Sequence, residues 1–413
     1  MPLSVSKDQM RKIIFVYLVS LVLYGNANHV LNLSRVLKEA EENNPEILAF
    51  KAGYEAVKSR TSPLLSLPDP VVAAEISSAE MKMYSVTQSL PFPTKLSGKS
   101  NIARAEAEVY RNIFLHKKQE VMNKVKKSYA NLFFLHKKYK VINESRAFFR
   151  QLFNIASHNY SVGRATQADM LRAQVELSKT ENDLLKIKDD ISIEETRLNI
   201  LLNRNTETPL GIPGEISTNA VEISLDSLLV IARENSPALR AAVWEEEKAE
   251  RMKSLAGRSY LPDFSFKFTQ EEMSGGRTDQ KYMVGLSIPI YFWGKQNYQV
   301  KEANANIKLA EAHFKEVENE ILLKIKEAKI NVDNFDRTRA LYKNTIIPQA
   351  KASLNSALSA YEANQVDFLN LLDSECTLIS FELEYYKALS DLYKAIADLE
   401  EAVGVNLTNI KEE

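Results

Sequence analysis

An internal repeat covers almost the whole chain of 413 residues. Six short segments recur in the same order, and the offset between partners stays between 192 and 201 residues. Chance could supply one such match, but six matches in register indicate two copies of one structural unit. The matched pairs are 33–45 with 225–237, 67–69 with 261–263, 89–92 with 287–290, 98–101 with 294–297, 160–163 with 361–364, and 198–203 with 399–404.

The start of each half predicts a helix that a proline interrupts. We expect these helices near 33–60 and 225–258. Breaks are expected before Pro45 and Pro237, because the residue that precedes a proline is pushed out of the helical region of backbone space.

Two segments with an apolar period of two follow each helix. In the second half Phe264, Phe266 and Phe268 alternate with polar residues, and a turn-rich loop separates this segment from a second alternating one. The pattern predicts a β-hairpin with one apolar face at 264–291. A weaker form of the same pattern predicts a hairpin at 71–92.

The rest of each half contains few turn residues, since the chain has only 12 Gly and 13 Pro. Segment 94–158 has no Pro, and its one Gly is Gly98. As a helix it would be roughly 100 Å long, and its apolar spacing near 3.5 is typical of a coiled coil. We therefore expect long helical hairpins at 94–204 and 295–404, with a kink at Pro348.

The N-terminal segment has the layout of a secretory signal peptide. Basic residues at positions 7, 11 and 12 precede an apolar run at 13–24, and small residues follow. The run is too short to cross a bilayer, so cleavage and export are expected; an uncleaved anchor helix is the alternative. The predicted organisation is a signal peptide 1–27, a first repeat 28–204, a linker 205–224, a second repeat 225–404 and a tail 405–413.

Composition and motifs argue against a chemical active site. With 53 basic and 54 acidic residues the chain is close to neutral, which excludes a charge-driven nucleic-acid partner. Segment 93–100 resembles a phosphate-binding loop, but Pro93 replaces its first glycine and has no N–H to donate. The five His show no metal-ligand spacing, and Cys376 is the one cysteine. We predict no catalytic residue, cofactor or metal site, and hence no enzyme.

Four amphipathic strands in an exported chain predict a membrane sheet. In lipid every backbone polar group must be paired, so such a sheet has to close, and four strands are too few for one chain to close alone. Aromatic residues after the strands suit a membrane interface: Tyr291, Phe292 and Trp293 in the second half and Phe92 in the first. The alternative is a soluble sheet that packs on the helices.

The repeated order of helix, hairpin and long helical hairpin over about 30–408 resembles the TolC-like outer membrane factor family. The resemblance implies a mainly α fold in which three chains form an α-barrel across the periplasm and a 12-stranded β-barrel in outer membrane lipid. It also implies an exit duct for a tripartite efflux pump. Its partners would be two further copies, a periplasmic adaptor (membrane fusion) protein and an inner-membrane transporter, and segment 205–224 would wrap the tube.

Several site residues follow from the resemblance. The tips of the helical hairpins would contact the adaptor, through Val162, Gly163, Arg164 and Ala165 in the first half and Asn364 and Gln365 in the second. A periplasmic gate would use Tyr361, Asp373, Asp169 and Asn370. Asn370 stands where the family has an acid and Val366 where it has an arginine. A role for Asp169 and Asp373 at the start of their helices, where an acid complements the dipole, is the alternative.

The sequence leaves the exported substrate open. Segments 67–70 and 88–93, with Met81 and Met83 nearby, are similar to the heavy-metal efflux branch of the family, although Thr94 stands where that branch usually has Gly. A drug-efflux or type I secretion duct is the alternative within the family. Outside it, the alternative is a soluble periplasmic coiled-coil scaffold or adaptor.

Overall fold

The computed structural model describes residues 30–76, 82–163, 165–216, 223–273, 277–363 and 365–407. These residues form two compact units. The first contains residues up to 42 together with 124–220 and 331–395, and the second contains 43–123, 221–330 and the residues from 396 onward. The predicted signal peptide, 1–27, lies outside the described residues.

Short helices open each half of the chain, and proline divides them at the expected places. In the first half α2 (Leu33–Asn43) is followed by α3 (Pro45–Ser59), and in the second half α6 (Leu225–Asn235) is followed by α7 (Pro237–Arg258). The side chain of Asn44 caps α3 by accepting the N–H of Glu46 at 2.9 Å. A cap of this kind satisfies a backbone donor that the helix itself leaves unpaired.

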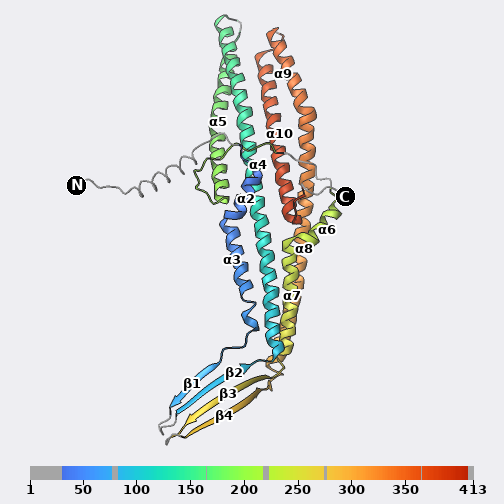
Figure 1. Ribbon diagram of the computed structural model, residues 1–413. Coiled ribbons are helices and arrows are strands. Elements are labelled where there is room, and N and C mark those ends of the chain that lie inside the picture. Colours follow the sequence, from blue (N-terminus) through green and yellow to red (C-terminus); the bar gives the residue numbers. More distant parts are fainter. Residues whose placement is uncertain are drawn as a thin grey trace, which may run out of the picture. The chain divides into compact units, whose positions relative to one another are not determined.

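Four antiparallel strands form one sheet in the order β1-β2-β3-β4, side by side in Figure 1. They are β1 (Val71–Ile76), β2 (Lys82–Leu90), β3 (Asp263–Glu272) and β4 (Thr278–Ser287). The two predicted hairpins thus pair with each other through β2 and β3.

Strand β4 ends at Ser287, earlier than the expected limit of 291. Pro289 has no N–H for a strand ladder, and the N–H of Ile290 donates to the carbonyl of Ile288 at 2.9 Å in a tight turn.

Long helices make up most of the remaining chain. The first half has α4 (Pro93–Ser161), a helix of 69 residues that is drawn without a break in Figure 1, and α5 (Gln167–Leu201). The second half has α8 (Lys295–Leu341), α9 (Ile347–Glu362) and α10 (Phe368–Val403). A π-helical turn, Tyr342–Ile346, joins α8 to α9. It includes residue 344, whose carbonyl would have bonded the N–H that Pro348 lacks.

The ends of both long helical hairpins share one core in the first unit. Its buried members come from three helices, so the hairpin ends are packed together as a single body. They are Phe149, Leu152 and Ala156 from α4, Ala173 from α5, and Phe368, Leu371 and Leu372 from α10.

The segment after α5 is fastened to the first unit by polar contacts. The Asn199 amide donates to the carbonyls of Thr206 and Thr208, at 3.3 and 2.8 Å. Arg204 forms a bidentate ion pair with the carboxylate of Glu39. The described part of the predicted linker therefore has a fixed path.

Gly404 ends α10 where two chain segments of the second unit meet closely. Its φ of +92° lies in the left-handed region. A Cβ at this position would lie 2.6 Å from the carbonyl oxygen of Asn235. Only glycine fits, because a side chain would clash with backbone that cannot swing away.

Gly404→Ala is therefore expected to lower the free energy of unfolding by about 3 kcal/mol or more, through left-handed strain plus overpacking. Gly163→Ala is the matched control. Gly163 also has a positive φ, of +71°, but nothing lies within 4 Å of its Cβ position, so about 1 kcal/mol is expected from strain alone. Chemical unfolding in detergent measures both. Equal losses for the two variants would contradict the close approach.

Glu375 is a buried acid in α10, with 7% of its surface exposed. It continues the buried face formed by Phe368, Leu371 and Leu372 at helical spacing. Burial, with a smaller contribution from the charge of Glu382, raises the pKa of Glu375 to about 7. Because the pKa is raised in the folded state, the charged form destabilises the fold, and this effect grows as pH rises from about 4.5 to above 7.

We expect Glu375→Gln to have little effect near pH 4.5 and to stabilise the protein by up to roughly 3 kcal/mol at pH 8. Unfolding midpoints measured across this pH range test the expectation. Glu384→Gln on the same helix is the control, because Glu384 is exposed and its ion pair with Lys387, within the described residues, is long at 4.0 Å. A stabilisation by Glu375→Gln that does not vary with pH would contradict a buried titrating carboxyl.

Candidate channel sites

The two inner strands of the sheet, β2 and β3, shield most of their polar face and expose much of their apolar face. On β3 the buried side chains are Thr269 and Glu271, whereas Phe264 and Phe266 are exposed. The extremes are Glu271, with 7% exposed, and Val284 on β4, with 76% exposed. A sheet packed on a soluble core shows the opposite pattern. An outward apolar face suits lipid, and a shielded polar face suits a water-filled interior.

The strand register makes the exposed apolar face continuous across the sheet. Val86, Phe268 and Tyr282 stand in one row over three strands, and the Phe268 and Tyr282 rings lie 5.3 Å apart. On the other face the Lys281 ammonium donates to both oxygens of Glu271, at 2.7 and 2.6 Å. The buried carboxylate is thus neutralised on the polar side.

The predicted interface aromatics lie where the sheet meets the helices. Tyr291, Phe292 and Trp293 are all exposed in the turn before α8. The Trp293 ring contacts those of Tyr291 and Phe292, with centroids 6.0 and 5.2 Å apart. Phe92 is half-buried, and its N–H donates to Asp263 at 2.9 Å. Their role at a membrane interface stays a prediction.

The predicted adaptor-contacting tips are tight turns between long helices. In the first, Gly163 has a φ of +71°, its N–H donates to the carbonyl of Tyr160 at 3.1 Å, and Val162 beside it is exposed. In the second, the N–H of Gln365 donates to the carbonyl of Ala360 at 2.8 Å. Ala165 is half-buried. Arg164 and Asn364 lie outside the described residues.

The predicted gate residues divide between the two hairpins of the first unit. Tyr361 packs edge-on against Phe368 of the shared core, with ring centroids 6.0 Å apart. Asp373 is exposed on α10. It lies beyond the first turn of that helix, which contains no acid, so the alternative role at the helix start is wrong for Asp373.

Asp169 and Asn370 both take part in helix starts. Asp169 closes a capping box with Thr166, whose hydroxyl donates to the Asp169 carboxylate at 2.7 Å while the Asp169 N–H donates back at 3.2 Å. The N–H of Asn370 donates to the carboxylate of Asp367 at 3.0 Å. These contacts match the alternative interpretation of Asp169. A gate role for either residue stays a prediction.

Sequence patterns did not indicate two features of the helices: the burial of Glu375, and the proximity of His116 and His313 in one cavity. Glu375 interrupts an otherwise apolar helical face, which is a weak signal because surface helices often carry one acid there. His116 and His313 are far apart in sequence, yet both line a cavity of about 290 Å³ in the second unit. No linear spacing could indicate this, because α4 and α8 contribute one histidine each.

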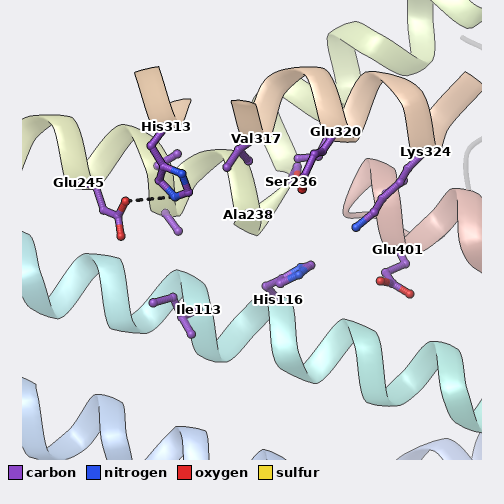
Figure 2. Close-up of a pocket in the computed structure, with 14 residues that line it drawn as sticks. Ile113, His116, Ser236, Ala238, Glu245, His313, Val317, Glu320, Lys324 and Glu401 are labelled. Carbon is purple, nitrogen blue, oxygen red and sulfur yellow. Dashed lines mark ion pairs between the residues drawn. The ribbon is translucent and has the colours of Figure 1, made fainter. Parts of the chain in front are cut away.

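Figure 2 shows this cavity, which α4, α7, α8 and α10 line together. His313 faces Glu245 across 3.5 Å, and Lys324 and Glu401 lie on the His116 side. Burial lowers the pKa of His116, and Lys324 lowers it further against an opposing effect of Glu401. In the described part of the chain, no group of three or more His, Cys, Asp or Glu is placed to hold a metal ion. Among the same residues, no helix has the length and apolar character needed to cross a bilayer.

Comparison with known proteins places the chain in one family. The family model described as "Outer membrane efflux protein" matches residues 36–204 and 228–405, which together are more than half of the chain. The unmatched segment between them, 205–227, includes the whole predicted linker.

A curated relative has a name related to metals. The cobalt-zinc-cadmium resistance protein CzcC of Cupriavidus metallidurans is 18% identical over 364 residues, which are 87% of this chain and 86% of the relative.

Solved structures share the fold. CusC matches with a TM-score of 0.79 at 14% identity, and the match covers 93% of this chain and 95% of the CusC chain. The outer membrane protein VceC of Vibrio cholerae matches with a TM-score of 0.76 at 15% identity, covering 91% and 96%. The chain therefore belongs to the outer membrane efflux protein family, and it is an outer-membrane efflux channel.

Proposed function

We propose that three copies of this chain form one exit duct, in which twelve strands close a barrel in the outer membrane and the long helices continue it through the periplasm. The observation that carries the proposal is the sheet, whose apolar face is exposed and whose polar face is shielded on its inner strands, β2 and β3. Such a sheet is stable in lipid only when its outer strands, β1 and β4, are paired with further strands. Further copies of the chain supply them.

The duct is passive in this proposal, and its partners are a periplasmic adaptor and an inner-membrane transporter. The hairpin tips around Val162–Gly163 and Gln365 are the surfaces offered to the adaptor, because both turns sit at the ends of helices that one core holds together. Segment 205–224 wraps the tube, and the fixed path of its described part supports this role.

The substrates that we propose are metal cations. The support is the name of CzcC, a cobalt-zinc-cadmium resistance protein. A cation pathway also fits the exposed acid Asp373 on α10, because three symmetry copies in a narrow bore would attract cations.

The orientation of the sheet is tested by two neighbouring residues of β4. Val284→Arg places a charge on the lipid face and is expected to destabilise the inserted sheet by about 2–4 kcal/mol. Outer-membrane trimer and tolerance to cobalt, zinc and cadmium should fall together. Met283→Arg is the matched control: Met283 is also exposed but lies on the other face, opposite Lys267. Normal insertion of both variants, or failure of both, would contradict the assigned faces.

The gate role of Asp373 is tested by conductance. Asp373→Ala removes three negative charges from the assembled bore, so single-channel recordings in lipid bilayers should show weaker block by divalent cations or a changed conductance. Asp169→Asn is a useful comparison, because the amide keeps an acceptor for the Thr166 hydroxyl. Identical recordings for Asp373→Ala and the unaltered protein would remove Asp373 from the gate.

A further inference from the structure

The two places where a strand leads into a long helix are repeat equivalents, yet only one of them is covered. At the first, between β2 and α4, the connector 259–263 of the other half packs closely. The Lys95 ammonium donates to the carbonyl of Leu261 at 2.7 Å and to the Asp263 carboxylate at 2.9 Å. The same carboxylate accepts the N–H of Phe92 at 2.9 Å. Asp263 therefore fastens the connector to the start of α4.

A glycine lets the end of α7, which leads into this connector, approach α4 closely. Gly98 is buried, and a Cβ there would lie 3.0 Å from a methyl carbon of Leu255 at the end of α7. Its repeat equivalent, Gly294, is exposed, and a Cβ there would meet only the carbonyl oxygen of Tyr291, at 3.8 Å. The second junction thus has a glycine at the same place as the first, but no described side chain packs against Gly294 as Leu255 packs against Gly98.

The second junction, between β4 and α8, is a cavity of about 620 Å³. Lys99, Lys295 and Gln296 line it, and so do Leu261 and the Lys95–Asp263 ion pair of the first junction. Gln296 is only 7% exposed, and its side-chain oxygen accepts no hydrogen bond. A buried unpaired acceptor is unfavourable, so Gln296 would accept a hydrogen-bond donor here, such as a backbone N–H, while the ammonium groups of Lys99 and Lys295 would attract a negative charge.

The repeat also identifies what fits there. Leu67-Pro68-Asp69 matches Leu261-Pro262-Asp263, the segment that covers the first junction. All three residues of the first-half copy are exposed, whereas all three of the second-half copy are half-buried. Asp69 makes no ion pair or hydrogen bond with the described part of the chain. The first-half segment 67–69 therefore carries the same leucine and acid as 261–263, but its side chains remain exposed within one chain.

One chain cannot bring these two parts together. The connector runs into β1, whereas the open junction follows β4, and these strands lie at opposite edges of the sheet (Figure 1). We infer that segment 67–69 of a second copy of this chain fills the β4–α8 junction, with Asp69 of that copy paired to Lys295. The inference rests on the proposed assembly and adds the contact that sets how neighbouring copies align.

Cross-linking tests the contact directly. In a Cys376→Ser background, Asp69→Cys and Lys295→Cys are combined, and outer membranes are treated with a short bis-maleimide. We expect denaturing gels to show dimers and trimers for the pair and neither for the single cysteines. Lys95→Cys with Asp263→Cys is the matched control, because the same geometry within one chain should cross-link without leaving the monomer position.

A charge exchange tests the ion pair itself. Asp69→Lys and Lys295→Asp should each lower the temperature at which the assembled protein dissociates in mild detergent. Together they should restore it, because the pair is re-formed with its charges reversed. A pair of unrelated surface positions would show two additive losses instead.

Three outcomes would overturn the inference, and they differ from failure of the proposed function. A heat-labile trimer that neither cross-links at 69 and 295 nor is rescued by the exchange leaves the duct intact but removes this contact. A phospholipid that native mass spectrometry detects on the trimer, and that Lys295→Asp removes without affecting assembly, makes the junction a lipid site. A monomer in the outer membrane removes the proposed duct and the contact together.

Discussion

Pairing of backbone hydrogen-bonding groups in lipid is the constraint on which the proposed architecture depends. A bilayer offers no water to an unpaired N–H or C=O, so a sheet with its apolar face outward cannot keep open edges there. This sheet has two outer strands, β1 and β4, and exposed apolar side chains on both. In the proposed duct, closure with further copies of the chain would meet that requirement, and the long helices after β2 and β4 would then be held side by side.

The internal repeat gives one chain two similar structural units, each with a β-hairpin and a long helical hairpin. Its irregularities show where the two units differ. A continuous helix, α4, in the first half corresponds to α8, a π-helical turn and α9 in the second. The junctions after β2 and β4 share a glycine–lysine pair, but only the first is covered within the chain. In a closed ring of repeated units, such an imbalance falls where one chain ends and the next begins.

Titratable groups gather in two parts of the helices with different surroundings. Glu375 is buried on α10 near the hairpin ends, and burial raises its pKa to about 7. In the cavity of Figure 2, by contrast, His116 and His313 lie among carboxylates and a lysine. Both groups lie where helices from distant parts of the sequence meet, so a change of charge there acts on packing.

The sequence by itself determined the secondary structure, because those signals are local, and the family, because the order of elements repeats along the chain. Proline breaks before Pro45 and Pro237, alternation at Phe264 and Phe266, and the scarcity of glycine act within a few residues of chain. Only the tertiary structure decided which face of the sheet is shielded, that Asp169 is held by Thr166, that Glu375 is buried, and that His116 and His313 share a cavity. These properties arise from contacts between segments far apart in the chain, and periodicity carries no information on such contacts.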